Sequence, residues 1–204
     1  RFFIPFETKS LGDTIAFIPY IDKFRKDKKC NVICSTFHNE LFKDQYPEIE
    51  FVEPGTTVNN LYGLYRMGMF YKGDGVNREI SYEHHRTDPK KEPLMKMGSD
   101  ILGLDYVEVK TKLPKLGNEK HKQVCIAVHS TAQSKYWNNP TGWQDVTDFL
   151  KGKGYDVILL SREEDGFMGN VNPTGITQHL KGSLNDVIKT LQESELFIGI
   201  SSGL

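Results

Sequence analysis

Residues 10–14, with the sequence SLGDT, decide the fold of this chain. They follow an apolar run over residues 2–6 and precede residues 15–24, where apolar side chains recur with helical spacing. This order predicts a strand, a tight turn and a helix. Such a turn brings a helix N-terminus to the carboxyl edge of a sheet, where open α/β folds bind their ligands. We expect Gly12 to supply the backbone freedom of the bend, and Thr14 to begin the helix.

Asp13, within this turn, admits two interpretations. Aspartate is among the best helix N-caps, so its carboxylate can serve simply as the cap. Alternatively, the carboxylate faces the crevice and acts as a general base. The stretch by itself favours the cap, and the second half of the chain decides how much weight the general base deserves.

Length and composition limit the classes of function. The chain has 204 residues, enough for one large domain or two small ones, and 38% of them are hydrophobic. A net charge of −1 argues against non-specific binding of nucleic acid, which needs a basic excess. No apolar run is long enough to cross a membrane, and no signal peptide is visible. The three cysteines form no metal or redox motif, which fits a buried or half-buried role in a reducing cytoplasm.

Strand and helix patterns alternate along the chain. Strands are predicted over residues 2–6, 31–35, 49–52, 106–109, 124–128, 155–160, 176–177 and 196–200. Helices are predicted over residues 14–28, 38–46, 93–102, 143–153 and 184–191, with Pro19 near the end of the first turn of the first helix. Residues 59–72 fit either state. Repeats of this length are typical of a parallel sheet with crossover helices.

The polar segment of residues 77–92 contains His84 and His85. Adjacent histidines point in different directions on any regular element, so they are poor ligands for one metal ion. We therefore predict an exposed loop here and no metal site.

Residues 110–122 have the composition of a linker, with Pro114, Gly117 and many charges. We place a domain boundary there, between Rossmann-like domains over residues 1–115 and 122–204. The dinucleotide fingerprint G-x-G-x-x-G is absent from both halves, which argues against an NAD or FAD enzyme. The chain lacks an initiator Met and stops directly after a predicted strand, so we expect the C-terminal domain to be truncated.

The loop over residues 129–137 has the side chains that a diphosphate site needs. It offers hydroxyls, an amide and a cation, on Ser130, Thr131, Gln133, Ser134 and Lys135. Lys135 can neutralise the charge that develops on a departing diphosphate, although an ordinary surface lysine is the alternative. Trp137 fits a core or interdomain aromatic as well as it fits stacking on a ligand.

Two further polar turns follow predicted strands. Ser201, Ser202 and Gly203 follow a strand expected to be buried and precede a presumed helix, so they predict an anion site, a helix cap, or both. Ser161 and Glu163 follow another strand. Most of this acidic cluster is expected to be solvated, with one carboxylate able to meet a sugar or ribose hydroxyl.

Five stretches of the chain match the sequence pattern of a known family of enzymes. In chain order they are residues 2–16, 32–42, 99–104, 134–137 and 197–204. On these the chain resembles the family-nine glycosyltransferases, the ADP-heptose heptosyltransferases. It is more closely similar to the autotransporter strand-loop-strand O-heptosyltransferases. The resemblance implies a GT-B type fold, in which two Rossmann-like domains face a cleft and the acceptor-side domain comes first.

The resemblance also implies roles for residues. Asp13 matches the general base of the family and Lys135 its cation at the donor phosphates, while Thr131, Gln133 and residues 201–203 match donor-binding positions. Lipopolysaccharide heptosyltransferases usually have Asp-Thr-Gly in the closing turn. This chain has Ser-Ser-Gly there, which favours the protein-modifying branch. Some members of that branch carry a cysteine metal finger, which would lie beyond the last residue of this chain.

The resulting hypothesis is an inverting heptosyltransferase that uses ADP-heptose and a serine of an autotransporter adhesin, with Asp13 and Lys135 confronting each other across the interdomain cleft. No metal is required for this catalysis if Lys135 and helix termini neutralise the diphosphate. Two alternatives stay open: a lipopolysaccharide core heptosyltransferase and a non-catalytic nucleotide-binding module. The sequence leaves homo-oligomerisation open as well.

Overall fold

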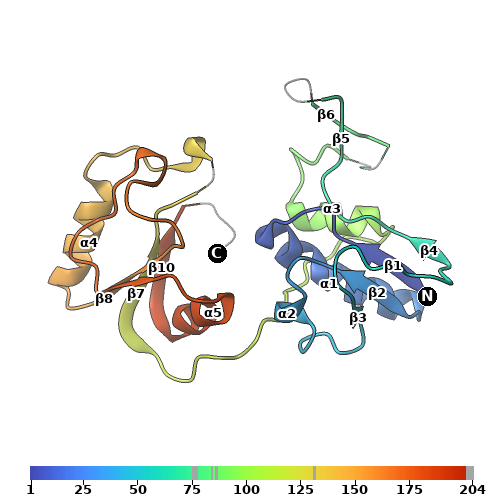
Figure 1. Ribbon diagram of the computed structural model, residues 1–204, viewed down its shortest axis with the longest axis horizontal. Helices are drawn as coiled ribbons and strands as arrows, with labels where there is room; N and C mark the ends of the chain where they lie inside the picture. The colour runs from blue at the N-terminus through green and yellow to red at the C-terminus, as the bar shows by residue number, and fades with distance from the viewer. Residues whose placement is uncertain (75–77, 84, 86, 131, 201–204) are drawn as a thin grey trace. The chain divides into compact units, whose positions relative to one another are not determined.

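The computed structural model of the chain describes residues 1–74, 78–83, 85, 87–130 and 132–200. These residues form two units, of which the first comprises Arg1–Leu113 and the second begins at Pro114 (Figure 1). The change of unit falls inside the predicted linker. Its later residues are nevertheless ordered by the second unit, because the backbone N–H groups of Leu116 and Gly117 both donate to Oε1 of Gln192.

The first unit is built on a parallel four-stranded sheet with the order β3-β2-β1-β4. Its strands are β1 (Phe2–Pro5), β2 (Val32–Ser35), β3 (Glu50–Phe51) and β4 (Gly63–Leu64). Its helices are α1 (Leu11–Lys28), α2 (Asn39–Phe42) and α3 (Leu94–Ile101). The β2 strand is buried along its whole length, as expected of a strand inside a parallel sheet.

Helix α1 supplies most of the core of this unit. Its buried apolar side chains contact the first strand, with the rings of Phe17 and Phe24 lying 6.2 and 5.2 Å from those of Phe6 and Phe2. The helix begins at Leu11, earlier than the sequence predicted. Pro19 therefore lies two turns inside the helix and not near the end of its first turn.

Pro19 leaves a backbone carbonyl of α1 without its usual partner, because proline has no N–H to donate to residue i−4. That carbonyl belongs to Ile15, and it accepts a hydrogen bond of 2.5 Å from the Thr111 hydroxyl. This hydrogen bond thus joins the N-terminal half of α1 to the segment that contains Thr111, which is 96 residues further along the chain. The segment also approaches α1 at Val107, whose carbonyl accepts a hydrogen bond of 2.9 Å from Tyr20.

The strand predicted over residues 106–109 is wrong. These residues are extended, but they pair with no strand in the part of the chain that the structure describes. They lie beside α1 instead, where the Val107 carbonyl accepts the hydrogen bond from the Tyr20 hydroxyl. Burial raises the pKa of Tyr20 to about 12, so its hydroxyl stays protonated as the donor that fixes this segment.

Residues 59–72, which fitted either state, form short strands. Their second strand, β5 (Tyr71–Lys72), pairs antiparallel with β6 (Glu79–Ile80) in a hairpin. The exposed loop predicted around the two histidines is wrong for His85, which is 3% exposed. Its Nε2 accepts a hydrogen bond from the backbone of Phe70, so this histidine organises the base of the hairpin. His84 lies outside the described residues.

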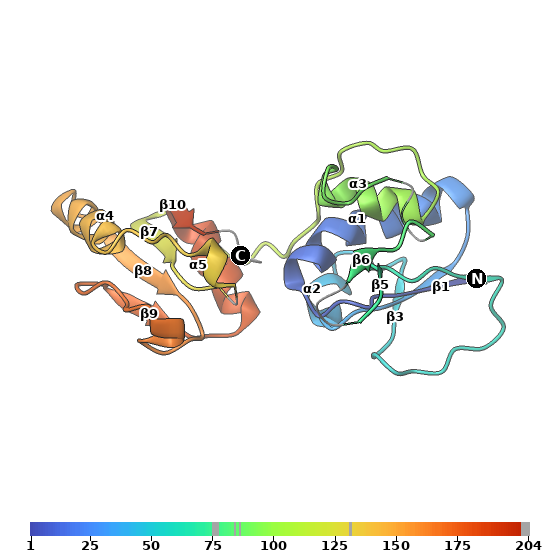
Figure 2. The ribbon, with the colours of Figure 1, turned by 90° about the horizontal axis from the view of Figure 1, so that it is seen from above.

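The second unit repeats the architecture with a parallel sheet of order β10-β7-β8-β9 (Figure 2). Its strands are β7 (His121–Ala127), β8 (Asp156–Leu160), β9 (Gln178–Leu180) and β10 (Ser194–Gly199). Its helices are α4 (Gly142–Gly152) and α5 (Leu184–Glu193), with short 3-10 turns η2 (Gln133–Lys135) and η3 (Phe167–Gly169).

The predicted burial of residues 124–128 on both faces is confirmed, and the alternation of strand side chains explains it. On one face, Val124 and Ile126 pack with Leu150 of α4. On the other face, Cys125 packs against Val187 and Leu191 of α5. A helix thus covers each face of the sheet at its central strand.

Three details of the predicted elements are corrected. The helix expected over residues 38–46 is a single turn, α2. The strand expected at residues 176–177 begins at Gln178, because the Thr177 hydroxyl accepts from Val157 N and donates to Asp156. The β10 strand is exposed and not buried, with Leu196 at 52%, since it lies at the edge of its sheet in the described part of the chain.

Both units share one strand order. Numbered in chain order within each unit, the strands run 3-2-1-4, as in one half of a Rossmann fold. The predicted α/β class with parallel sheets is therefore confirmed for the described residues. Ligands of such sheets bind outside the carboxyl ends of the strands, where the order reverses between strands 1 and 4. The turns that follow β1 and β7 lie at these points.

Candidate functional site

The turn after β1 is capped by Ser10 and not by Asp13. The Ser10 hydroxyl accepts a hydrogen bond of 3.3 Å from Asp13 N, and its backbone is extended. Asp13 is the third residue of α1, so its carboxylate is not needed as the N-cap. The interpretation of this residue as a simple helix cap is therefore wrong.

The Asp13 carboxylate is held by a neighbour in the same turn. Thr8 donates a hydrogen bond of 2.9 Å from its hydroxyl to Oδ2 of Asp13, and the same hydroxyl accepts from Ser10 N at 3.0 Å. Within the described part of the chain, Oδ1 has no hydrogen bond and no cation pairs with Asp13. A half-buried carboxylate at a helix N-terminus, with one oxygen fixed and one unused, has the form of a general base.

The other turn residues support this arrangement. Gly12 is the second residue of α1 with helical backbone, so the expectation that it supplies the freedom of the bend is wrong. Thr14 is fully buried and its hydroxyl donates to Ser10 O at 2.9 Å. Glu7 pairs with Arg66 at 2.7 Å, and the hydrogen bond from Arg66 lowers the pKa of the Glu7 carboxyl. The Glu7 carboxylate is therefore used in an ion pair, whereas Asp13 has no ion pair among the described residues.

The loop after β7 is fixed by Tyr136. Its buried hydroxyl donates to Ser130 O at 2.9 Å and accepts from Ser130 N at 3.1 Å. Gln133 and Lys135 lie in the exposed turn η2 between these two anchors. Thr131 lies outside the described residues. The two ends of the loop are therefore held together, and the described polar side chains between them are exposed to solvent.

Lys135 is exposed, and none of the described carboxylates lies within ion-pair distance of its ammonium group. Some other charged groups that follow strand ends in the second unit do form ion pairs with each other. Glu164, for example, pairs with Lys181. An ammonium group without a protein partner, beside the carboxyl end of β7, is available to an anionic ligand.

His129 joins the loop after β7 to the loop after β8. It is 8% exposed, and its Nε2–H donates to Oδ1 of Asn172 at 2.7 Å. Its ring also meets Tyr136 and Phe167 edge to face. Among the described residues, its buried Nδ1 has no hydrogen-bond partner. Sequence reasoning placed His129 in this loop without a role, because the bond to Asn172 spans 43 residues.

Ser161 and Glu163 follow β8 as predicted. The Ser161 hydroxyl accepts from Glu163 N at 3.0 Å, and its carbonyl accepts from His179 at 3.0 Å. Glu163 is half-buried without an ion pair among the described residues, whereas Glu164 and Asp165 are exposed. Of this acidic cluster, Glu163 is the carboxylate best placed to meet a ligand hydroxyl.

Trp137 borders a separate pocket of about 400 Å³. The indole is 45% exposed and lies edge to face against Trp143, with ring centroids 5.4 Å apart. A Cβ at Gly142 would stand 2.6 Å from this ring, so only glycine allows the contact. Of the described residues that were predicted to bind substrate, Trp137 is the one that lines this pocket. Trp137 is thus an exposed residue at the border of a pocket and not a core residue.

The structure therefore assembles two groups of predicted residues, one in each unit. Asp13, with Gly12 and Thr14, belongs to the turn after β1 in the first unit. The second unit places Ser130, Gln133 and Lys135 at the carboxyl end of β7, and Ser161 and Glu163 at that of β8. Ser201, Ser202 and Gly203 lie outside the described residues.

The described residues hold no group of three or more His, Cys, Asp or Glu side chains that could bind a metal ion. All three cysteines are free, Cys34 and Cys125 are buried, and Cys30 is half-buried. Burial raises the pKa of the Cys34 thiol, which keeps it protonated. None of the helices in the described ranges is both long and apolar enough to cross a bilayer.

Comparison with known proteins places these features in context. No family model matches the chain. The autotransporter heptosyltransferase TibC of Escherichia coli O78:H11 is 34% identical in an alignment of 213 positions that covers 98% of this chain and 50% of TibC. The autotransporter heptosyltransferase Aah of E. coli is also 34% identical, over 98% of this chain and 52% of Aah. A Burkholderia thailandensis protein, the inactive autotransporter heptosyltransferase BimC, is 29% identical over 77% of this chain and 37% of its own length.

Solved structures agree with these relatives. The crystal structure of TibC, an iron-containing dodecameric glycosyltransferase, matches with a TM-score of 0.86 and 32% identity, over 99% of this chain and 53% of TibC. The E. coli heptosyltransferase WaaC with ADP matches with a TM-score of 0.63 and 11% identity, over 100% of this chain and 82% of WaaC, and supports the fold alone. The chain is a homologue of the autotransporter heptosyltransferases and spans about half the length of the curated relatives it matches.

Proposed function

We propose that the full-length protein is an inverting glycosyltransferase that moves heptose from ADP-heptose to a serine hydroxyl of an autotransporter adhesin. The observation that carries this proposal is the identity of 34% with named autotransporter heptosyltransferases over 98% of the chain. A TibC structure in complex with ADP-D-β-D-heptose, similar at a TM-score of 0.76, supports the choice of donor.

In this proposal the two units are the domains of a GT-B transferase. Residues 1–115 form the acceptor side, and residues 122–204 form part of the donor side, whose remainder lies outside this chain. The shared strand order and the similarity to WaaC support two ligand-binding Rossmann-like domains. Their polar turns at the carboxyl ends of β1 and β7 would meet the acceptor and the donor respectively.

Asp13 is the proposed general base. It takes the proton of the acceptor hydroxyl on Oδ1, while Thr8 holds Oδ2. The acceptor oxygen then bonds to the anomeric carbon as the bond from that carbon to the diphosphate oxygen breaks. ADP leaves from the opposite face, so the configuration inverts. Proton transfer to a positioned carboxylate contributes about 10²–10⁴-fold to such reactions.

Lys135 is the proposed electrostatic partner of the leaving group. Its exposed ammonium group is not used by a carboxylate among the described residues, so it can neutralise the charge that develops on the diphosphate. Ser130, Gln133 and Thr131, with the turn of Ser201, Ser202 and Gly203, would bind the phosphates. Ser161 and Glu163 would meet donor hydroxyls, and Trp137 the remaining part of the substrate.

TibC is an iron-containing glycosyltransferase. The described residues contain no group of three or more candidate ligands, so they do not fit an iron site. No step of the proposed reaction is routed through a metal. A metal finger beyond Leu204 is a separate proposal that the rest of the full-length sequence decides.

Assembly and location follow from the relatives and are proposals. TibC is described as dodecameric, and we propose that the full-length protein is also an oligomer. Because ADP-sugars are made and used where nucleotides are present, we place the reaction in the cytoplasm.

BimC gives weight to a second candidate function. A relative that is 29% identical is named inactive, so a homologue with this fold can lack transfer activity. The second candidate is a non-catalytic nucleotide-binding module, which binds ADP but transfers no sugar. The lipopolysaccharide rival has weaker support, because the relatives at 34% identity are autotransporter heptosyltransferases.

The deciding experiment incubates the full-length protein with radiolabelled ADP-heptose and two acceptors, an autotransporter adhesin and a lipopolysaccharide core oligosaccharide. We expect label on the adhesin. Label on the oligosaccharide would support the lipopolysaccharide enzyme, and ADP binding without label on either acceptor would support the non-catalytic module.

A further inference from the structure

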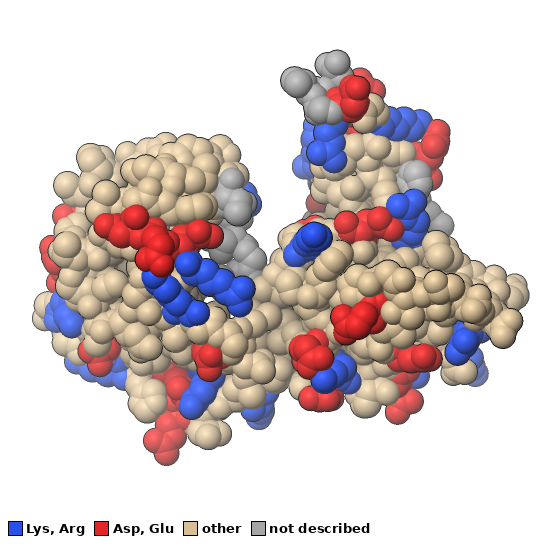
Figure 3. Space-filling view, in the orientation of Figure 1, with Lys and Arg blue, Asp and Glu red and all other residues tan. Residues whose placement is uncertain are grey.

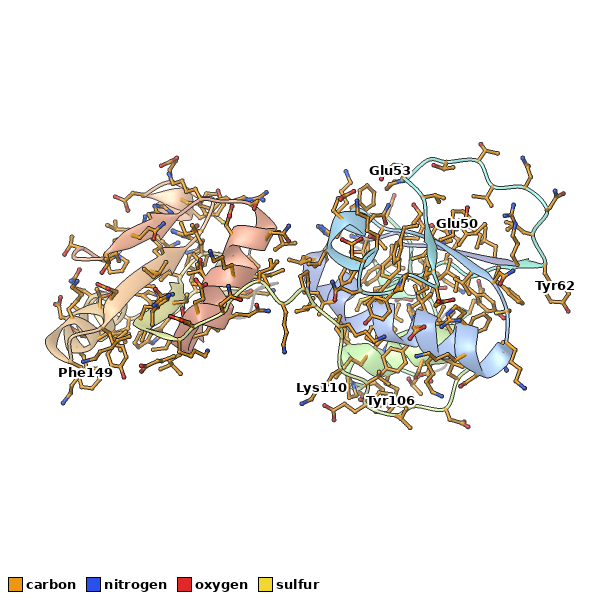
Figure 4. All side chains as sticks on the ribbon, turned by 90° about the horizontal axis from the view of Figure 1, so that it is seen from below. Glu50, Glu53, Tyr62, Tyr106, Lys110 and Phe149 are labelled. Atoms are coloured by element: carbon orange, nitrogen blue, oxygen red, sulfur yellow. The ribbon has the colours of Figure 1, made fainter. Side chains whose placement is uncertain are left out.

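A groove of about 520 Å³ lies beside the turn that carries Asp13. Its floor is the first turns of α1, with Gly12, Ile15 and Ala16, and its sides are Leu94 and Met95 at the start of α3 and residues 108–111. All of these residues belong to the first unit. Figure 4 marks Lys110 on the segment that forms one side.

The shape of the groove follows from small side chains on the helix. Gly12 and Ala16 are four residues apart, so they share one face of α1 and leave it open. Larger residues at these two positions would fill the floor. The groove is therefore a consequence of sequence at two positions of one helix.

Pro19 fixes the wall opposite α3. It frees the carbonyl of Ile15, and Thr111 donates its hydroxyl hydrogen to that carbonyl. Because Thr111 lines the groove and Ile15 is part of its floor, this bond holds wall and floor at a set distance. The groove is thus a pinned feature of the fold.

The charge of the groove limits its occupant. Glu108 and Lys110 are both exposed and have opposite signs, so they cancel, and the other lining side chains are apolar apart from Thr111. A phosphorylated or acidic sugar needs a cluster of basic groups. A polypeptide with uncharged side chains needs apolar surface and few charges, which this groove offers.

Asp13 stands at the border of the groove. It follows Gly12 directly and precedes Ala16 by three residues, a spacing that makes side chains neighbours on a helix. Asp13 does not itself line the groove, so a hydroxyl bound at its carboxylate would lie next to the groove, within reach of a chain that passes over Gly12 and Ala16.

We propose that this groove binds the acceptor polypeptide, taking uncharged apolar side chains next to the hydroxyl residue that receives the sugar. The proposal rests on the proposed function, because it requires Asp13 to act on an acceptor hydroxyl. Ala16 is then a specificity-determining residue: its small size admits the flanking side chain of the acceptor.

The test uses the full-length protein, radiolabelled ADP-heptose, and two synthetic peptides with one central serine, flanked either by valine and alanine or by glutamate. We expect the apolar peptide to be labelled with a KM at least tenfold lower. The variant Ala16→Leu should raise the KM for that peptide about tenfold, with the KM for ADP-heptose and the melting temperature unchanged. Lys28→Leu is the matched control, since it adds the same side chain at the exposed far end of the same helix.

A second variant keeps the test decisive if Ala16→Leu unfolds. Glu108→Lys changes an exposed residue and makes the groove basic. It should lower the KM for the glutamate-flanked peptide several-fold and leave the donor KM unchanged. An unchanged KM in this variant would overturn the proposal.

The experiment distinguishes an error in the groove proposal from an error in the proposed function. Equal labelling of both peptides, or an Ala16→Leu enzyme with an unaltered peptide KM, would overturn the groove alone. Label on a lipopolysaccharide core oligosaccharide in place of the peptides would overturn the polypeptide assignment. Absence of transfer to every acceptor by the unaltered protein would contradict the proposed function, and the groove with it.

Discussion

The hydroxyl of Thr8 donates a hydrogen bond of 2.9 Å to Oδ2 of Asp13. The same hydroxyl oxygen accepts the backbone N–H of Ser10, so its hydrogen has one direction available and that direction is the carboxylate. One oxygen of Asp13 is thereby fixed by a residue of its own turn. The other oxygen is left for a substrate proton, and this asymmetry is what supports the general-base role.

We expect the variant Thr8→Val to lower turnover about tenfold. Valine keeps the shape of the side chain but cannot donate to Asp13, and a lost hydrogen bond to a charged group is worth about 1.5–3 kcal/mol. The loss should fall on kcat, with the dissociation constant for ADP-heptose unchanged. Thr8→Ser should restore turnover, and an equally poor Thr8→Ser enzyme would show that the side chain acts by packing.

We expect Lys135→Ala to lower kcat/KM about 10²- to 10³-fold, the size of effect seen when a transition-state charge loses its partner. Lys135→Arg should recover part of the loss because it keeps the charge. Lys189→Ala, another exposed lysine of the second unit, is the control and should leave the rate unchanged. Steady-state kinetics with ADP-heptose measure all three, and equal rates for the Lys135→Ala and Lys189→Ala enzymes would remove Lys135 from the mechanism.

Two glycines of α4 should respond to alanine in opposite ways. A Cβ at Gly142 would lie 2.6 Å from the Trp137 ring, whereas one at Gly152 would meet nothing within 4 Å. We expect Gly142→Ala to destabilise the protein by about 1–3 kcal/mol through overpacking and to shift the tryptophan fluorescence. Gly152→Ala should be neutral or slightly stabilising. Urea unfolding monitored by fluorescence checks both, and equal stabilities would mean that Trp137 is not held as described.

Asp22 should contribute a pH-dependent part of the stability. Burial raises the pKa of its carboxyl, but hydrogen bonds from Lys26 and Arg25 lower the pKa by a larger amount. The net pKa is therefore below its usual value. A pKa that is lowered in the folded state stabilises the protein above the unfolded pKa, about 3.9. The contribution is then lost as the pH falls through the lower folded value.

We therefore expect Asp22→Asn to destabilise the protein by about 1–3 kcal/mol at pH 7. The difference from the unaltered protein should shrink as the pH falls below about 4. Asp27→Asn, which affects a more exposed ion pair with Lys23, should cost less. The free energy of unfolding in urea at several pH values measures this, and a difference that stays constant down to pH 2.5 would contradict the linkage.

Much of the fold follows from local patterns. Residues 124–128 are continuously apolar, and the structure places them as a central strand with a helix on each face. The sequence-based predictions fail where tertiary contacts determine the local structure. Residues 106–109 have strand composition, yet they run along α1, and the carbonyl of Val107 accepts from Tyr20 in place of a strand partner. His85 is polar in sequence but is buried, because its ring accepts from Phe70 N.

The candidate site was predicted residue by residue but not in its supporting contacts. Asp13 and Lys135 were named from the order of turns and from the family resemblance. The bonds from Thr8 to Asp13 and from His129 to Asn172 carry no local signal, since they depend on the three-dimensional path of each loop. The local sequence favours Asp13 as the cap, because Ser10 and Asp13 are both good cap residues and only backbone geometry separates them.

Acidic and basic side chains lie interspersed on the face of each unit seen in Figure 3, as the net charge of −1 leads one to expect. In the proposed function, local groups such as Lys135 would recognise ADP-heptose, and the affinity should depend on them individually.

The measurement that tests the account most directly is the turnover of Asp13→Asn with ADP-heptose and an adhesin acceptor, beside the affinity of the same variant for ADP-heptose. Asparagine keeps the size of the side chain and an oxygen for Thr8, but it cannot take a proton. We expect turnover to fall about 10³-fold or more while the dissociation constant stays within about twofold. Turnover close to that of the unaltered enzyme would contradict the general-base role of Asp13 and the mechanism built on it.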